Sequence, residues 1–155
     1  MRGVQLRYNY RVYPTPGQQI ELAKAFGCAR VVFNDGLRLR RQARESGLPY
    51  VPDGELSGRV ITEAKKTEAR AWLGEVSAVV LQQALADLNM AYRNFFASVT
   101  GRRKGRRVAP PRLRSRKDNR QAIWSCPGSV DRTGLSATRQ RSRIGGRGGV
   151  RTGLG

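Results

Sequence analysis

Residues 10–37 decide the fold, and they read YRVYPTPGQQIELAKAFGCARVVFNDGL. Tyr8, Tyr10 and Val12 alternate with polar neighbours, and this period of two predicts a half-buried β-strand over about residues 4–12. Pro14 ends the strand, because proline lacks the backbone donor that a sheet ladder needs. Since a lone strand is not stable, its pairing partners must come from later in the chain.

The second half of the same stretch predicts helices. Thr15 and Gln18 have the identities of a capping box, with a proline directly after the cap. Apolar side chains then recur at helical spacing, but Gly27 interrupts the run before it resumes. The pattern therefore predicts two helices joined at this glycine, one over about residues 16–25 and one over about residues 28–45.

Two more helices are predicted after a loop rich in glycine and proline at residues 47–54. One covers about residues 56–71, and the other covers about residues 78–98 with Ser77 as its N-cap. The last helix has the clearest periodicity in the chain, which indicates a side that faces the core. Its apolar stripe consists of Leu81, Ala84, Leu85, Leu88, Ala91, Tyr92, Phe95, Phe96 and Val99. The predicted fold class is mainly α with a minor β part, built on a helical lobe of about four helices.

The charge of the chain indicates a polyanionic partner. Its 155 residues include 30 Lys and Arg against 11 Asp and Glu, with no His, for a formal net charge of +19. Such a field favours phosphate backbones but specifies no base sequence. Residues 101–120, GRRKGRRVAPPRLRSRKDNR, have too little apolar content for a core, so we expect a flexible or extended basic segment. A solvated basic surface and a ribosomal type of protein are the alternatives.

Candidate nucleic-acid contacts come from three places. Polar side chains share one arc of the second predicted helix, arginines lie on the outer face of the first strand, and the basic segment supplies the rest. The candidates are Arg7, Arg11, Arg30, Asn34, Arg38, Arg41, Arg103, Lys104, Arg106 and Arg107. For any single arginine of the helix, an ordinary solvated face is the alternative. Arg40 falls inside the apolar arc, so either the helix ends before it or its side chain snorkels to the surface.

No catalytic or metal-binding residue can be assigned from the sequence. Two cysteines, Cys28 and Cys126, without any histidine cannot complete a tetrahedral zinc site or a Cys/His pair. Metal-assisted phosphodiester hydrolysis needs clustered carboxylates, and beyond Asp87 only Asp118 and Asp131 remain. The N-terminus has no signal-peptide pattern and no apolar run could span a bilayer, so we expect a cytoplasmic protein.

The pattern YPTPxQ…LAKxFGCxRxVxN…L in residues 13–37 resembles the N-terminal, helix-turn-helix region of OrfB/TnpB proteins, the transposase-like proteins of bacterial insertion sequences. Further matches come at residues 72–73 and 81–84. Others follow at helical intervals, at Leu88, Ala91, Asn94, Phe95 and Phe96. The resemblance covers about residues 4–124, and several blocks in order are far more specific than one short motif.

The resemblance implies what the intact family does. Its members are understood as RNA-guided DNA endonucleases, with DNA and a guide RNA as partners, a RuvC-like domain that holds divalent metal, and a zinc element. Both metal sites would lie downstream of the residues present here, so we expect no cofactor and no enzymatic activity from this chain. Residues 1–13 would begin a split, barrel-like β domain, residues 14–100 would form the recognition lobe, and residues 101–124 would return to the β domain with incomplete barrel strands.

The resemblance stops near Trp124, and the composition changes there. Residues 125–155 contain no Lys, Phe, Tyr, Trp or His, and Arg, Gly, Ser and Thr dominate. One interpretation is a disordered Arg/Gly-rich tail that binds single-stranded nucleic acid, and the other is off-frame translation of GC-rich DNA. We favour the second, because ordered motifs and apolar periodicity end together, and we expect disorder in either case.

The sequence thus predicts a truncated or frameshifted N-terminal fragment of an OrfB/TnpB-type protein that binds nucleic acid and lacks the nuclease domain. A stand-alone helix-turn-helix regulator of DNA and a ribosome-associated RNA-binding protein are the alternatives. The regulator would have a high ratio of specific to non-specific affinity for duplex DNA.

Overall fold

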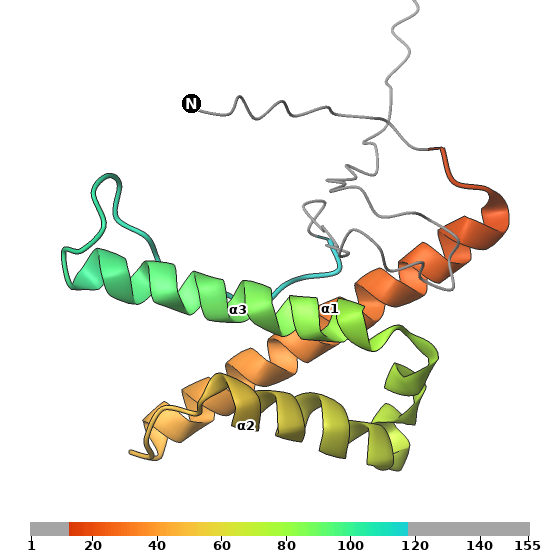
Figure 1. Cartoon of the computed structure of the whole chain (residues 1–155), viewed down its shortest axis with the longest axis horizontal. Helices are drawn as coiled ribbons and strands as arrows, with labels where there is room; N and C mark the ends of the chain where they lie inside the picture. Colours follow the sequence, from red (N-terminus) through yellow and green to blue (C-terminus); the bar gives the residue numbers. More distant parts are fainter. Residues whose placement is uncertain (1–12, 118–155) are drawn as a thin grey trace, which may run out of the picture.

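The computed structural model describes residues 13–117 of the chain (Figure 1). The strand predicted over residues 4–12, the strand-like run at residues 121–124 and the tail lie outside these residues. Within the described part the chain is mainly helical, as predicted, and contains no strand. The minor β part is therefore not supported. Residues 108–117, which were expected to help supply barrel strands, form no ladder in the described part, and side chains of the helices bind their backbone instead.

Helix α1 (Pro16–Glu45) is one continuous helix of 30 residues. Its start is the predicted capping box, in which Gln18 N donates to Thr15 Oγ1 at 3.4 Å and Thr15 N donates to Gln18 Oε1 at 3.0 Å. The predicted break at Gly27 is wrong. A helical glycine costs only about 1 kcal/mol relative to alanine, and the helix buries side chains on both sides of it, including Phe26 and Cys28. The helix ends at Glu45, and Gly47 shortly after it has a φ of +69°, which favours glycine.

The segment after α1 is helical with changing hydrogen-bond patterns. It comprises α2 (Asp53–Ser57), the π-helical η1 (Gly58–Glu63), and the 3-10 helices η2 (Ala64–Lys66) and η3 (Glu68–Glu75). The single helix predicted over residues 56–71 therefore starts earlier and is interrupted at Thr67. The backbone of Thr67 is extended, with a φ of −84° and a ψ of 143°, and its hydroxyl donates to Ala64 O at 2.7 Å.

Helix α3 (Ala78–Val99) begins after Ser77, as predicted, and crosses α1 (Figure 1). Its apolar stripe is buried in the first half of the helix, through Leu88, but reaches the surface at the other end, where Phe96 is 46% exposed. The two helices meet closely at Gly36, because a Cβ there would lie 3.1 Å from the Cδ2 atoms of Leu85 and Leu88. The α2–η3 segment packs against this pair, and the three parts share one apolar core.

The structure excludes both alternatives for Arg40, an earlier helix end and a side chain that snorkels to the surface. The helix continues past it, and the residue is only 4% exposed. Arg40 Nη2 donates to Asp53 Oδ1 at 2.8 Å, and its guanidinium carbon lies 4.5 Å from the Tyr50 ring centroid and 5.2 Å from that of Tyr92. Its Nε also donates to Val51 O, at 3.3 Å. A counter-charge and two aromatic faces thus hold a charge inside the apolar arc.

Candidate nucleic-acid interface

The strongest concentration of charge in the described chain follows α3. Residues 101–117, here called the basic tract, contain nine basic and no acidic side chains, whereas residues 13–100 contain eleven basic and nine acidic ones. Among the described residues, Arg114 is the only member of the tract that forms an ion pair, with its Nη2 3.4 Å from Asp87 Oδ2. The other eight cations therefore keep their full attraction for an external polyanion.

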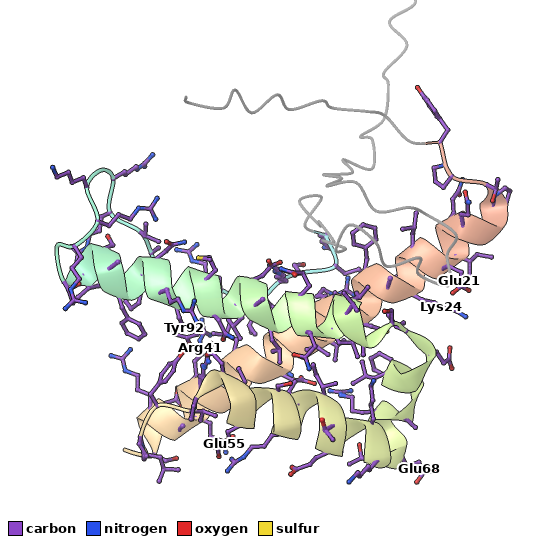
Figure 2. All side chains as sticks on the ribbon, viewed as in Figure 1. Glu21, Lys24, Arg41, Glu55, Glu68 and Tyr92 are labelled. Atoms are coloured by element: carbon purple, nitrogen blue, oxygen red, sulfur yellow. The ribbon has the colours of Figure 1, made fainter. Side chains whose placement is uncertain are left out.

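The first part of the tract, residues 101–107, is a tight loop at the end of α3, here called the basic loop (Figure 1). Gly101 and Gly105 have φ angles of +72° and +109°, which favour glycine. Arg103 N donates to Ala97 O at 3.0 Å, so the loop folds back on the last turn of the helix. Long side chains fan outward from it into open space (Figure 2). The backbone of these residues turns sharply and is therefore not extended, whereas the flexibility of the segment stays a prediction.

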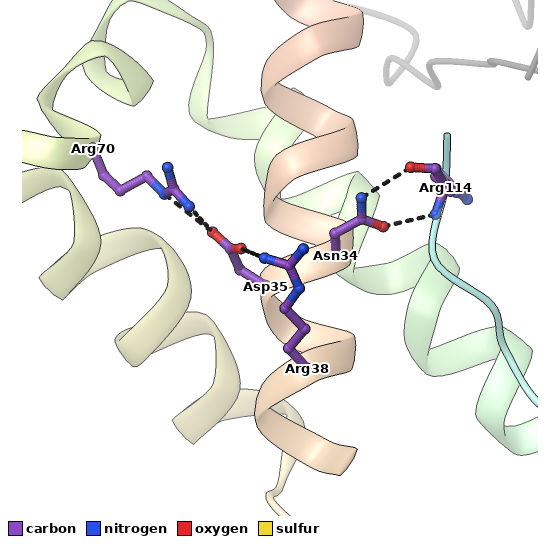
Figure 3. Close-up of polar contacts among 5 residues, drawn as sticks. All are labelled: Asn34, Asp35, Arg38, Arg70 and Arg114. Atoms are coloured by element: carbon purple, nitrogen blue, oxygen red, sulfur yellow. Dashed lines mark hydrogen bonds and ion pairs between the residues drawn. The ribbon is translucent and has the colours of Figure 1, made fainter. Parts of the chain in front are cut away.

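The second part, residues 108–117, is here called the strap, and it lies along α1 and α3. Val108 N donates to Ser98 Oγ of α3 at 3.0 Å, and Arg41 Nη2 of α1 donates to Pro111 O at 2.9 Å. Asn34 makes two hydrogen bonds with the backbone of Arg114 (Figure 3). The strap is therefore held by both long helices.

The four candidates on α1 do not form one surface. Asn34 and Arg41 contact the strap. Arg38 is exposed but turns toward Asp35, whose carboxylate lies 3.8 Å from it and also accepts from Arg70 Nε at 3.1 Å (Figure 3). Arg30 is half-buried on the side of a shallow cavity.

The remaining candidates divide between the loop and the chain terminus. Arg103, Lys104, Arg106 and Arg107 lie together in the basic loop, and all four are exposed. Arg7 and Arg11 lie outside the described residues. The candidates predicted from the sequence do not include the other unpaired cations of the tract, although the same lack of nearby acidic residues could have identified them. These are Arg102, Arg112, Arg116 and Lys117.

A shallow cavity of about 350 Å³ lies between α1 and η3. Its lining includes Lys24, Arg30, Trp72 and Glu75 around the buried Cys28. Burial, and then the nearby Glu75 carboxylate, raise the pKa of the Cys28 thiol, so its thiolate is disfavoured. In residues 13–117 no group of three or more His, Cys, Asp or Glu side chains is placed to hold a metal ion. None of the helices in these residues is long and apolar enough to cross a membrane.

Comparison with known proteins gives the family. A family model described as a helix-turn-helix domain of IS605-type OrfB proteins matches residues 1–48. A "Putative RNA-guided DNA endonuclease" of Streptomyces pristinaespiralis is 42% identical over 123 residues, which are 77% of this chain and 28% of that protein. The "Putative RNA-guided DNA endonuclease InsQ" of Escherichia coli K12 is 31% identical over 112 residues, 72% of this chain and 26% of that protein.

A shorter relative matches along most of its own length. The "Virulence protein VsdF" of Salmonella dublin is 32% identical over 92 residues, which are 55% of this chain and 76% of that protein. The chain thus spans about a quarter of the two endonuclease relatives and about three quarters of this one. On these matches, the chain belongs to the OrfB/TnpB-type family of insertion-sequence proteins and corresponds to a minor part of its two endonuclease-named members.

Proposed function

We propose that this chain is a nucleic-acid-binding module of an OrfB/TnpB-type RNA-guided DNA endonuclease, with DNA and a guide RNA as its partners. The basic tract carries the proposal. It presents eight cations without an ion pair among the described residues, and its backbone is held on a folded helical body. A surface of this kind binds phosphates by releasing their counterions, and it binds them without regard to base sequence.

The number of unpaired cations sets a limit on the salt dependence of binding. Each phosphate neutralised on duplex DNA contributes about −0.9 to the slope of log K against log salt. If all eight cations of the tract contacted phosphates, the slope would be about −7, and contact by half of them would give about −4. A measured slope between these values would fit binding by the tract.

The shape of α1 favours contact with the backbone over base reading. A helix-turn-helix places a second helix in the major groove while the first crosses the backbone, and the two meet at a turn. Residues 16–45 form one helix without such a turn, and two of the four polar candidates on it contact the strap. These contacts argue against a stand-alone sequence-specific regulator. A ribosome-associated protein would share the charge, so structured RNA belongs in the binding assays.

In this proposal the polypeptide binds without cutting. Hydrolysis of a phosphodiester with metal ions needs carboxylates gathered around the metal. The described aspartates are instead dispersed into separate arginine pairs, with Asp35 beside Arg70, Asp53 beside Arg40 and Asp87 beside Arg114. Incubation of purified protein with plasmid and linear DNA in magnesium or manganese tests this directly, because any strand cleavage above a mock preparation would contradict it.

The binding experiment uses a charge-removal variant and a control of equal charge. The variant replaces Arg103, Lys104, Arg106 and Arg107 with Ala. The control replaces Arg44, Arg59, Lys65 and Lys66 with Ala, since these also lie in the described part but outside the tract. Fluorescence anisotropy with labelled duplex DNA, single-stranded DNA and structured RNA, over a range of salt, gives affinity and slope. We expect the slope of the tract variant to fall by about 3 to 4 units and that of the control to stay near wild type. Equal losses in both variants would mean that only net charge matters, and would refute the assignment of the site.

A further inference from the structure

We propose that Asn34 is a positioning residue that keeps the basic loop in its binding shape by clamping the strap behind it. This inference rests on the proposed function, because it concerns the same tract. Asn34 was a candidate for direct contact with nucleic acid, yet its side-chain amide is turned toward the protein's own backbone (Figure 3).

The clamp is made by one side chain that supplies both a donor and an acceptor. Asn34 Nδ2 donates to Arg114 O at 3.0 Å, and Arg114 N donates to Asn34 Oδ1 at 2.8 Å. An asparagine can make this pair with any residue of the strap, because it binds the backbone N–H and C=O and ignores the side chain. The two residues are 80 positions apart in the sequence, so the clamp ties the end of the described chain to the middle of α1.

The side chain of Arg114 strengthens the same junction. Its guanidinium carbon lies 3.8 Å from the centroid of the Phe33 ring, next to Asn34 in α1, and its Nη2 lies 3.4 Å from Asp87 of α3. Through Arg114 alone, the strap is thus attached to both long helices. Of all the cations in the tract, this is the one whose charge serves the protein's own structure.

The clamp reaches the basic loop through the strap, because the first residue of the strap, Val108, directly follows the loop and is also bound to α3. At the start of the loop, Arg103 N donates to Ala97 O, and just after its end Val108 N donates to Ser98 Oγ. Residues 101–107 hold five cations and no acidic residue, and like charges on a free segment repel one another and extend it. Anchors on both sides oppose that extension, so the free protein already holds the loop compact and loses less entropy when it binds.

Asn34→Ala and Ser98→Ala test this inference, because each removes an anchor without changing the charge. Gln42→Ala is the matched control, since Gln42 is an exposed amide of the same helix and its side chain makes no hydrogen bond in the described part. With labelled single-stranded and duplex DNA at one fixed salt, we expect Asn34→Ala to weaken binding about tenfold. Ser98→Ala is expected to weaken it about threefold, and Gln42→Ala to leave it unchanged. Far-UV circular dichroism verifies that each variant stays folded. If Asn34→Ala does not fold, Asn34→Ser decides the question, because the shorter side chain stays polar but lacks the amide that pairs with both the N–H and the C=O of Arg114.

A double-mutant cycle separates positioning from direct contact. In the background that lacks the charges of Arg103, Lys104, Arg106 and Arg107, the loop has little to position, so Asn34→Ala should cause no further loss. Amide hydrogen exchange of unbound protein should be faster at Arg103 and Val108 in Asn34→Ala, and unchanged in the middle of α1.

The outcomes distinguish this inference from the proposed function. If Asn34→Ala weakens binding equally in both backgrounds, or leaves wild-type affinity unchanged while the protein stays folded, the positioning role is wrong and the binding site stands. If the wild-type protein shows no salt-dependent binding to any of the nucleic acids, the proposed function fails first, and the clamp has nothing to position.

Discussion

Replacing Gly27 with alanine tests whether α1 is one helix or the two helices of a helix-turn-helix. In the structure Gly27 lies within α1 and has no positive φ, and apart from its two neighbours and the local helix backbone no atom lies within 4 Å of the place where a Cβ would be added. Alanine is about 1 kcal/mol more favourable than glycine inside a helix. We therefore expect Gly27→Ala to raise the free energy of unfolding by about 0.5–1 kcal/mol.

Gly36→Ala is the matched comparison, because it makes the same chemical change in the same helix where space is absent. Its Cβ would lie 3.1 Å from the Cδ2 atoms of Leu85 and Leu88 and 3.5 Å from Leu56 Cδ2. The gain in helix propensity is the same, but overpacking costs about 1–3 kcal/mol. The difference between the two variants removes the propensity and leaves the packing cost, so Gly36→Ala should be less stable than Gly27→Ala by about 1–3 kcal/mol.

Urea unfolding followed by far-UV circular dichroism measures both values, with thermal midpoints as a second readout. A change of 1 kcal/mol moves the midpoint of a domain of this size by about 4 °C. If Gly27 instead formed a turn with a positive φ, alanine there would be strained and would destabilise the protein by about 1 kcal/mol or more. A destabilised Gly27→Ala variant would therefore refute the continuous helix and restore the two-helix interpretation.

Removing the carboxylate of Asp53 should destabilise the protein more than removing Arg40, because the side chain of Arg40 is 1% exposed and that of Asp53 is 43% exposed. Asp53→Ala leaves the buried guanidinium of Arg40 without this carboxylate and should lower the free energy of unfolding by about 2–4 kcal/mol. Arg40→Met fills similar space and should lower it by less than about 1.5 kcal/mol. The opposite order in urea unfolding would contradict this. Thr15→Ala removes the capping box and should cost about 1 kcal/mol in the same assay, unless the helix begins elsewhere. Burial raises the pKa of Tyr50 and of Tyr92 above the ordinary value of 10.0, so the folded state holds these protons more tightly than the unfolded state. The resulting stability is complete below about pH 10 and falls as the pH rises through the folded pKa values; phenolate absorbance should therefore appear at higher pH in native protein than in urea, and coincident curves would contradict this.

The sequence predicted the features that depend on local chemistry. The capping box at Thr15 and the position of Ser77 before α3 are both as expected, because their hydrogen-bonding partners or helical neighbours lie within a few residues. The break at Gly27 was wrong, since the weak local preference of one glycine competes with the burial of a whole helix face. Apolar residues recur at helical spacing on both sides of Gly27, but this spacing does not say whether one helix or two helices bury them.

Two other features depend on contacts between distant residues. Arg40 can be buried only because Tyr50, Asp53 and Tyr92 surround it. These three residues come from a loop, from α2 and from α3, respectively. The clamp between Asn34 and Arg114 is equally non-local. A helix-period pattern places Asn34 on a polar arc correctly, but it does not distinguish an amide that faces solvent from one that holds another segment.

The continuous α1 also bears on where sequence information would come from if the proposed function holds. Base reading by α1 would require its polar arc to enter a groove, and on the side of Asn34 and Arg41 the strap already occupies that arc. In that case the exposed cations of the basic loop would contact phosphates, which are the same in every sequence. A protein with this surface would bind many duplexes about equally, so target choice would have to come from elsewhere. In guided nucleases it comes from base pairing with the guide, while the protein holds the heteroduplex by its shape and backbone. Helix-turn-helix geometry is therefore not needed for this role. Two long helices, of which α3 anchors the charged loop and α1 holds the strap behind it, would be sufficient.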